Sequence, residues 1–204
     1  EAVKHTGVPR EGDYLRWQYV SYKITGNIAR YVRVDEDGNY IKDEKGDYIV
    51  EYYAYNFNWE LAYYTDTSME RQVDAKVEQL VEEELPLKAG HENDVYNIGV
   101  VYDYICSHVT YDYENLPDED YKEKYTAYAA LFDGRAVCQG YSNLMYRMLL
   151  ELGIDCRLVS GKGDGEAHGW NIVKVEDMYY NLDSTWDAGK DLYSWYLKGD
   201  KEFT

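Results

Sequence analysis

Apolar residues recur with the period of an α-helix through the middle of this chain. A capping box at 67–70 opens the first series, which continues as a helix to about Leu85. A second helix is expected over residues 93–108, capped by its first or second residue, and a third over residues 118–131. The middle of the chain is therefore predicted to be largely helical.

The longest apolar stripe follows Cys138. Its members share one helix face and are Tyr141, Leu144, Met145, Met148, Leu149 and Leu152. Gly153 comes directly after the stripe, where helices commonly end in a left-handed residue. Counting back along this helix places Cys138 in its first turn.

Strand patterns lie on both sides of these helices. Residues 13–64 are rich in aromatic residues and are expected to form strands. Within them, D-E-D-G-N-Y-I at 35–41 is nearly repeated by D-E-K-G-D-Y-I at 43–49. An EF-hand loop would need glycine where the first copy has Tyr40. Each copy is therefore predicted to form a hairpin turn around its glycine.

The C-terminal part is expected to form three strands. The first covers residues 154–160 and is followed by a glycine-rich loop at 161–165. The other two, 168–175 and the stretch from residue 178 onward, form a hairpin if Glu176 and Asp177 make a two-residue turn.

This turn would set the register of the hairpin. Val175 would face Met178, and continuing the ladder would place Asp183 opposite Trp170. His168 would then share a face with Asp183, with their Cα atoms roughly 7–8 Å apart. A slip of one residue would put the two side chains on opposite faces.

The order of elements favours an α+β fold, because strands, then helices, then a helix and strands do not alternate as βαβ units do. We expect helices packed on an antiparallel sheet. Residues 1–66 would form a β-rich extension packed on the core, and residues 67–204 the core itself. A chain of 204 residues suits one such compact unit.

The composition excludes some classes of binding partner. A net charge of −18 and a pI of about 4.5 disfavour nucleic acid and anionic membrane surfaces, which attract basic proteins. Three cysteines without a C-x-x-C pair argue against a disulfide framework and against a zinc site, and neither a metal nor a cofactor is expected. The 25 tyrosines suit either half-buried strands or a binding groove.

The sequence says less about location. No apolar run approaches the ~20 residues of a membrane span, and no signal peptide is recognised. The chain begins at Glu1 rather than at methionine, which favours a processed piece of a longer protein. An extracytoplasmic or cell-surface location is compatible with this.

Three polar residues suggest thiol chemistry. A thiol at the start of a helix faces unpaired backbone N–H groups and the positive end of the helix dipole, which favour the nucleophilic thiolate. His168 would accept the proton of Cys138, and Asp183 would orient His168. Each residue alone is more often structural, as a buried thiol, a loop histidine or a turn aspartate. Their combination indicates an enzyme.

Three motifs, V-C-Q-G-Y-S-N-L, H-G-W-N and N-L-D-S-T-W-D, resemble the signature of the transglutaminase-like superfamily, whose core is similar to that of papain-type cysteine proteases. The resemblance covers about Tyr111 to Asp187. It implies that Cys138 is the nucleophile, His168 the base and Asp183 the third member of a triad. The family includes cross-linking enzymes, peptidases, amidases and members that have lost activity.

One position departs from the papain-type pattern, because Phe132 stands where those enzymes carry a glutamine that stabilises the oxyanion. The backbone N–H of Cys138 can supply one donor, with Tyr111 or Tyr128 as candidates for a second. The weaker candidates for substrate binding share a place near the motifs and are Gln139, Gly140, Trp170, Trp186 and the glycines of residues 161–165. A packing or turn role is the alternative for each of them.

The sequence therefore predicts an acyl-transfer enzyme acting on peptide or protein amide bonds. Water is the default acceptor of an acyl group, so a cysteine peptidase or amidase is expected. The alternatives are a cross-linking transglutaminase and a catalytically silent binding or cell-surface module of the same fold. The oligomeric state is left open.

Overall fold

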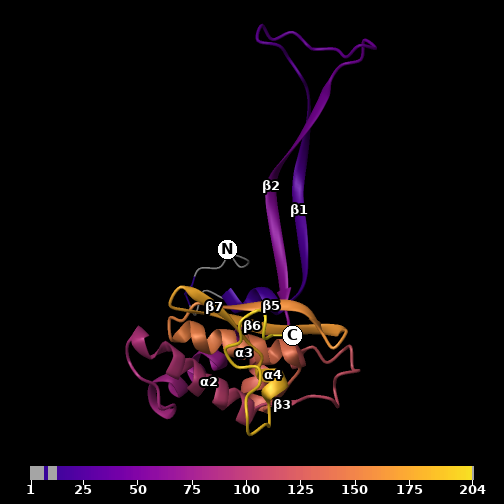
Figure 1. Ribbon diagram of the computed structural model, residues 1–204. Coiled ribbons are helices and arrows are strands. Elements are labelled where there is room, and N and C mark those ends of the chain that lie inside the picture. Colours follow the sequence, from indigo (N-terminus) through magenta and orange to yellow (C-terminus); the bar gives the residue numbers. More distant parts are fainter. Residues whose placement is uncertain (1–6, 9–12, 204) are drawn as a thin grey trace. The chain divides into compact units, whose positions relative to one another are not determined.

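The computed structural model describes residues 7–8 and 13–203 (Figure 1). Contacts between residues divide the chain into two compact units, one formed by residues 20–62 and the other by the remainder. The segment that ends at Tyr19 belongs to the larger unit, together with the chain from Tyr63 onward. The predicted division at residue 66 and the packing of the extension on the core stay predictions.

The smaller unit is built on a two-stranded sheet of β1 (Tyr19–Val32) and β2 (Val50–Tyr63). The two acidic repeats between the strands form turns, as predicted. The Asp35 carboxylate accepts hydrogen bonds from the backbone N–H groups of residues 37 and 39. In the second copy, the Asp43 carboxylate accepts hydrogen bonds from the backbone N–H groups of residues 45 and 47. Gly38 and Gly46 have φ values of +85° and +88°, a conformation that favours glycine.

Among the described residues, all helical elements belong to the larger unit. Its helical elements are η2 (Asp13–Trp17), α1 (Thr67–Gln79), η3 (Leu80–Glu84), η4 (His91–Asn93), α2 (Asp94–His108), η5 (Glu123–Tyr125), η6 (Ala129–Asp133), α3 (Cys138–Glu151) and α4 (Ser184–Asp187). The predicted helices over 93–108 and after Cys138 are confirmed. Among the described residues, no helix combines the length and the apolar character that crossing a membrane requires.

The predicted cap of the first helix is wrong by one residue. Asp66, rather than Thr67, is the N-cap of α1, and its carboxylate accepts hydrogen bonds from the backbone N–H groups of Ser68 and Met69 at 2.8 and 2.9 Å. An aspartate satisfies these two unpaired donors and also meets the positive end of the helix dipole.

The predicted helix over 118–131 is also wrong. Instead of one helix, the chain forms the short turn η5 and a separate helical segment over residues 127–133 that includes η6. Lys124 is fully buried, and the chain before this segment bends around its ammonium group. This group donates to the carbonyls of Asn115 and Leu116 at 2.7 and 3.1 Å, and also to that of Asp118. Tyrosines spaced by four and three residues gave a helical pattern that this tertiary contact overrides.

An antiparallel sheet of β5 (Cys156–Gly163), β6 (Glu166–Val175) and β7 (Met178–Leu182) carries the C-terminal motifs, and Figure 1 shows α3 against it. The predicted pairing of Val175 with Met178 is confirmed. The predicted glycine-rich loop is largely wrong, because β5 runs through Gly163 and only Asp164 and Gly165 turn.

The core of the larger unit lies around α3. The apolar stripe of α3 packs with buried residues of α2 and of the sheet, among them Ile98, Tyr102, Cys156 and Val173. The architecture is therefore α+β, with helices packed on an antiparallel sheet, as predicted. This packing fixes the start of α3 beside β6, where the polar motifs meet.

Candidate active site

Cys138 is the first residue of α3, and its thiol is partly exposed. Val137 precedes it as the N-cap, and its side chain makes no capping hydrogen bond. The approach to Cys138 is fixed by a short parallel pair, β3 (Thr110–Tyr111) and β4 (Arg135–Ala136), in which Tyr111 lies opposite Ala136. The helix start thus presents the thiol in a defined place.

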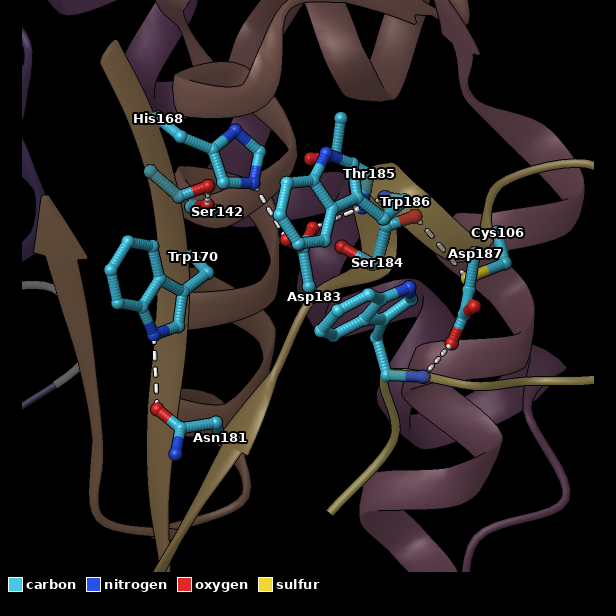
Figure 2. A network of polar contacts seen from close by, with 12 residues as sticks. Cys106, Ser142, His168, Trp170, Asn181, Asp183, Ser184, Thr185, Trp186 and Asp187 are labelled. Atoms are coloured by element: carbon cyan, nitrogen blue, oxygen red, sulfur yellow. Dashed lines mark hydrogen bonds and ion pairs between the residues drawn. The ribbon is translucent and has the colours of Figure 1, made fainter. Parts of the chain in front are cut away.

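His168 lies on β6 and contacts Asp183, as the sequence predicted. Nε2 of the imidazole and Oδ2 of Asp183 are 2.6 Å apart (Figure 2). The His168 side chain is 9% exposed and the Asp183 side chain is fully buried. Because Nε2 contacts the carboxylate, Nδ1 is the ring nitrogen left for the thiol.

Both carboxylate oxygens of Asp183 have hydrogen-bond partners. The paired ladder of β6 and β7 ends at Asn171 and Leu182, one residue before the predicted partner, and Asp183 instead caps α4. Its Oδ1 accepts hydrogen bonds from the backbone N–H groups of Thr185 and Trp186, both at 3.1 Å. The carboxylate is therefore aimed at His168 by the start of a short helix.

The pKa of His168 reports this environment. Burial lowers it, but hydrogen bonds and negative charge from Asp183 and Cys138 outweigh the burial and raise the pKa to about 9. The influence of Cys138 on this pKa indicates that the thiol lies near the imidazole. At neutral pH the imidazole is therefore largely in its protonated form.

The sequence reasoning missed a second buried carboxylate, that of Asp187 at the end of α4. It accepts hydrogen bonds from the Tyr102 hydroxyl and the backbone N–H of Trp195, both at 2.8 Å, and from the backbone N–H of Ser194 at 3.0 Å. Tyr102 also donates to the backbone carbonyl of Asp183 at 2.8 Å. The last letter of the motif N-L-D-S-T-W-D was the signal available for it.

Among the weaker candidates, Tyr111 is close to the site. It lines a cavity of about 610 Å³ together with His168 and Trp186. Burial and the negative charge of Cys138 raise its pKa to about 12. Trp186 stacks on His168, with ring centroids 4.6 Å apart at 10°, and Trp170 lies 6.1 Å from the imidazole at 21°.

The remaining weaker candidates contact their own chain. Tyr128 packs on Phe132, with ring centroids 4.8 Å apart. The Gln139 amide donates to the backbone carbonyl of Trp17. A Cβ on Gly140 would lie 2.9 and 3.0 Å from the carbonyls of residues 124 and 126, so glycine here allows a close approach within the protein.

The other two cysteines are core residues, as predicted. Cys106 is 3% exposed and Cys156 is fully buried. Burial raises the pKa of both thiols, which disfavours the reactive thiolate. Among the three free thiols, Cys138 alone is partly exposed.

Comparison with known families agrees with this architecture. The sequence model of the transglutaminase-like superfamily matches residues 84–188, which include the start of α3, the strands of the sheet and α4. The chain therefore belongs to the transglutaminase-like superfamily.

Individual relatives are more distant. The kyphoscoliosis peptidase of Mus musculus is 25% identical over 182 residues, covering 80% of this chain and 27% of the relative. The kyphoscoliosis peptidase of Homo sapiens is 29% identical over 108 residues, covering 47% of this chain and 16% of the relative. The chain thus spans about a quarter or less of the length of these curated relatives.

Two solved structures are also similar. A TGase has a TM-score of 0.41 and 17% identity, with 74% of this chain and 48% of that chain covered. A proposed cysteine protease from Cytophaga hutchinsonii has a TM-score of 0.44 and 11% identity, with 82% and 65% covered.

Proposed function

We propose that this domain is a cysteine peptidase or amidase that cleaves peptide or protein amide bonds. The observation that carries the proposal is the contact of the buried Asp183 carboxylate with His168, whose pKa also responds to Cys138. A carboxylate, an imidazole and a partly exposed thiol in this order suit nucleophilic acyl transfer. The relatives named as peptidases support water as the acceptor.

The proposed reaction begins at Cys138. Its thiolate attacks the carbonyl carbon of the amide, and the π electrons of the carbonyl move to oxygen to give a tetrahedral oxyanion. The imidazolium of His168 then gives its proton to the amide nitrogen. The carbon–nitrogen bond breaks, the amine leaves, and a thioester remains on Cys138.

Water completes the cycle. Neutral His168 takes a proton from the water, and the resulting hydroxide attacks the thioester carbon to release the carboxylic acid and the thiolate. Asp183 keeps the imidazole oriented through both steps. The proposed donors to the oxyanion are the backbone N–H of Cys138 and the hydroxyl of Tyr111. Cys138 is the first residue of α3, and Tyr111 lies opposite Ala136 in the strand that leads to α3.

Trapping the thioester tests the proposal. The full chain is incubated with peptide libraries, with and without a primary amine, and adducts are mapped by mass spectrometry. We expect acyl adducts on Cys138 that decay by hydrolysis, and no amide turnover by Cys138→Ala with its circular dichroism retained.

The outcomes separate the alternatives. Faster decay with incorporation of the added amine would instead identify a cross-linking transferase. An absence of adducts, together with alkylation of Cys138 no faster than that of an ordinary free thiol, would identify a binding module. Unchanged turnover by Cys138→Ala would rule out the mechanism.

A further inference from the structure

Five aromatic side chains beside the candidate site form a closed ring. The ring runs from His168 through Trp170, Phe203, Trp195 and Trp186, and then back to His168. Successive ring centroids lie 6.1, 5.5, 5.2, 4.5 and 4.6 Å apart. The imidazole of the proposed base is therefore one member of a continuous aromatic wall.

The five aromatic residues all line one cavity of about 510 Å³. The cavity is lined by the five aromatic residues, by Gly163, and by the charged residues Lys162, Asp164 and Lys190. It shares His168, Trp186 and Lys190 with the cavity that Tyr111 lines, so the two cavities meet at the imidazole. A group bound in the aromatic cavity would thus lie against the imidazole of the proposed base.

Two glycines on β5 make room for the tryptophans. A Cβ on Gly161 would come within 2.6 Å of the Trp170 ring, and a Cβ on Gly163 within 2.5 Å of the Trp186 ring. The two positions are separated by one residue and share a face of the strand. The indoles can therefore lie directly on the backbone of β5, which shapes the cavity and explains the glycines in this strand.

The C-terminal segment is anchored where it supplies the other two rings. The backbone N–H of Trp195 donates to the buried carboxylate of Asp187. The backbone carbonyl of Trp195 accepts a hydrogen bond from the backbone N–H of Asp183 at 3.0 Å. Asn181 pairs with Lys198 through two backbone hydrogen bonds of 2.8 and 3.0 Å. The cavity is thus largely preformed, which reduces the cost of ordering on binding.

The chemistry of the lining indicates the occupant. Trp195 meets Trp186 at 64° and Phe203 at 86°, so the wall offers both ring faces and ring edges, which suits a further aromatic ring. Two lysines against one aspartate give the lining a net positive charge, which disfavours a lysine or arginine side chain in spite of the aromatic faces.

We propose that this cavity binds an aromatic side chain of the peptide substrate, on a residue that flanks the amide attacked by Cys138. The inference rests on the proposed function, because it takes the ligand of the site to be a peptide. It adds a substrate preference that is set by Trp195 and Phe203, which lie outside the three sequence motifs.

Binding to the full chain carrying Cys138→Ala tests this without turnover. Matched peptides carry phenylalanine, glycine, lysine or glutamate beside the same amide, and affinity is measured by calorimetry. We expect the phenylalanine peptide to bind at least ~10-fold more tightly than the glycine and lysine peptides. Adding Trp195→Ala or Phe203→Leu to the Cys138→Ala chain should remove most of this difference in affinity. The control, Trp59→Ala in the smaller unit, should leave the difference unchanged.

A second variant guards against misfolding. Lys162→Glu with Lys190→Glu leaves the aromatic ring in place, and we expect it to improve binding of the lysine peptide relative to wild type. Equal affinity for all four peptides, a preference for lysine in the unaltered cavity, or binding of oligosaccharides alone would overturn the proposal. Aromatic preference in binding without any acyl adduct would uphold the cavity and reject the proposed function.

Discussion

At the scale of single residues, the site depends on how Asp183 is held. Its carboxylate accepts two backbone hydrogen bonds from α4 and contacts the imidazole, so it has little freedom to turn away from His168. The sequence predicted this contact because a two-residue turn sets the register. The last residue of the third motif was a signal for Asp187, but its partners could not be predicted, because Tyr102 and Trp195 lie outside the motifs.

The raised pKa of His168 gives a pH dependence with a definite sign. The charged imidazole is needed to protonate the leaving amine, so kcat/KM should fall as pH rises through about 9. By linkage, the stability that the raised pKa contributes is fully present below about 6.5 and is lost as pH rises through about 9.

Asp183→Asn removes one cause of the raised pKa. We expect the basic limb of the pH–rate profile to move to lower pH and kcat/KM to fall about 100-fold. The control is Asp177→Asn, the same change in the exposed turn of the same hairpin. A basic limb that stays in place in Asp183→Asn would contradict the assigned role.

At the scale of elements, periodicity predicted the structure wherever local contacts decide it. The stripe of α3 and the turn between β6 and β7 follow from residues close in sequence. The region 118–131 escaped prediction because the buried ammonium of Lys124 binds carbonyls several residues away. The glycines of β5 were misread as a loop because their partners, the two indoles, lie on other elements.

The start of α1 offers a direct test of how one element is determined. Because Asp66 accepts both capping hydrogen bonds, Asp66→Ala should lower the free energy of unfolding by about 1 kcal/mol. Thr67→Ala serves as the control and should have a much smaller effect. Urea denaturation of both variants measures the difference. A larger loss of unfolding free energy in Thr67→Ala would show that Thr67, and not Asp66, caps the helix.

At the scale of the whole molecule, the division into two units has a practical meaning. The chain leaves the larger unit after Tyr19 and re-enters it at Tyr63. Next to these points, the backbone N–H of Tyr64 donates to the Gln18 carbonyl at 2.8 Å. The two ends of the smaller unit are therefore joined by a contact that belongs to the larger one.

Replacing residues 20–62 by a short glycine–serine linker should leave the larger unit folded. We expect a cooperative thermal transition and unchanged alkylation of Cys138, because the contacts of the candidate site all lie within the larger unit. Loss of the cooperative transition would show that the smaller unit is required for folding. A linker inserted after residue 46, within the smaller unit, is the control.

Because Cys106 and Cys156 are buried, only Cys138 in the folded chain can react with a bulky electrophile. A maleimide dye would therefore attach at one position in the folded chain and at three once the chain is denatured. The stoichiometry of such tagging would serve as a built-in gauge of how much of a sample is intact.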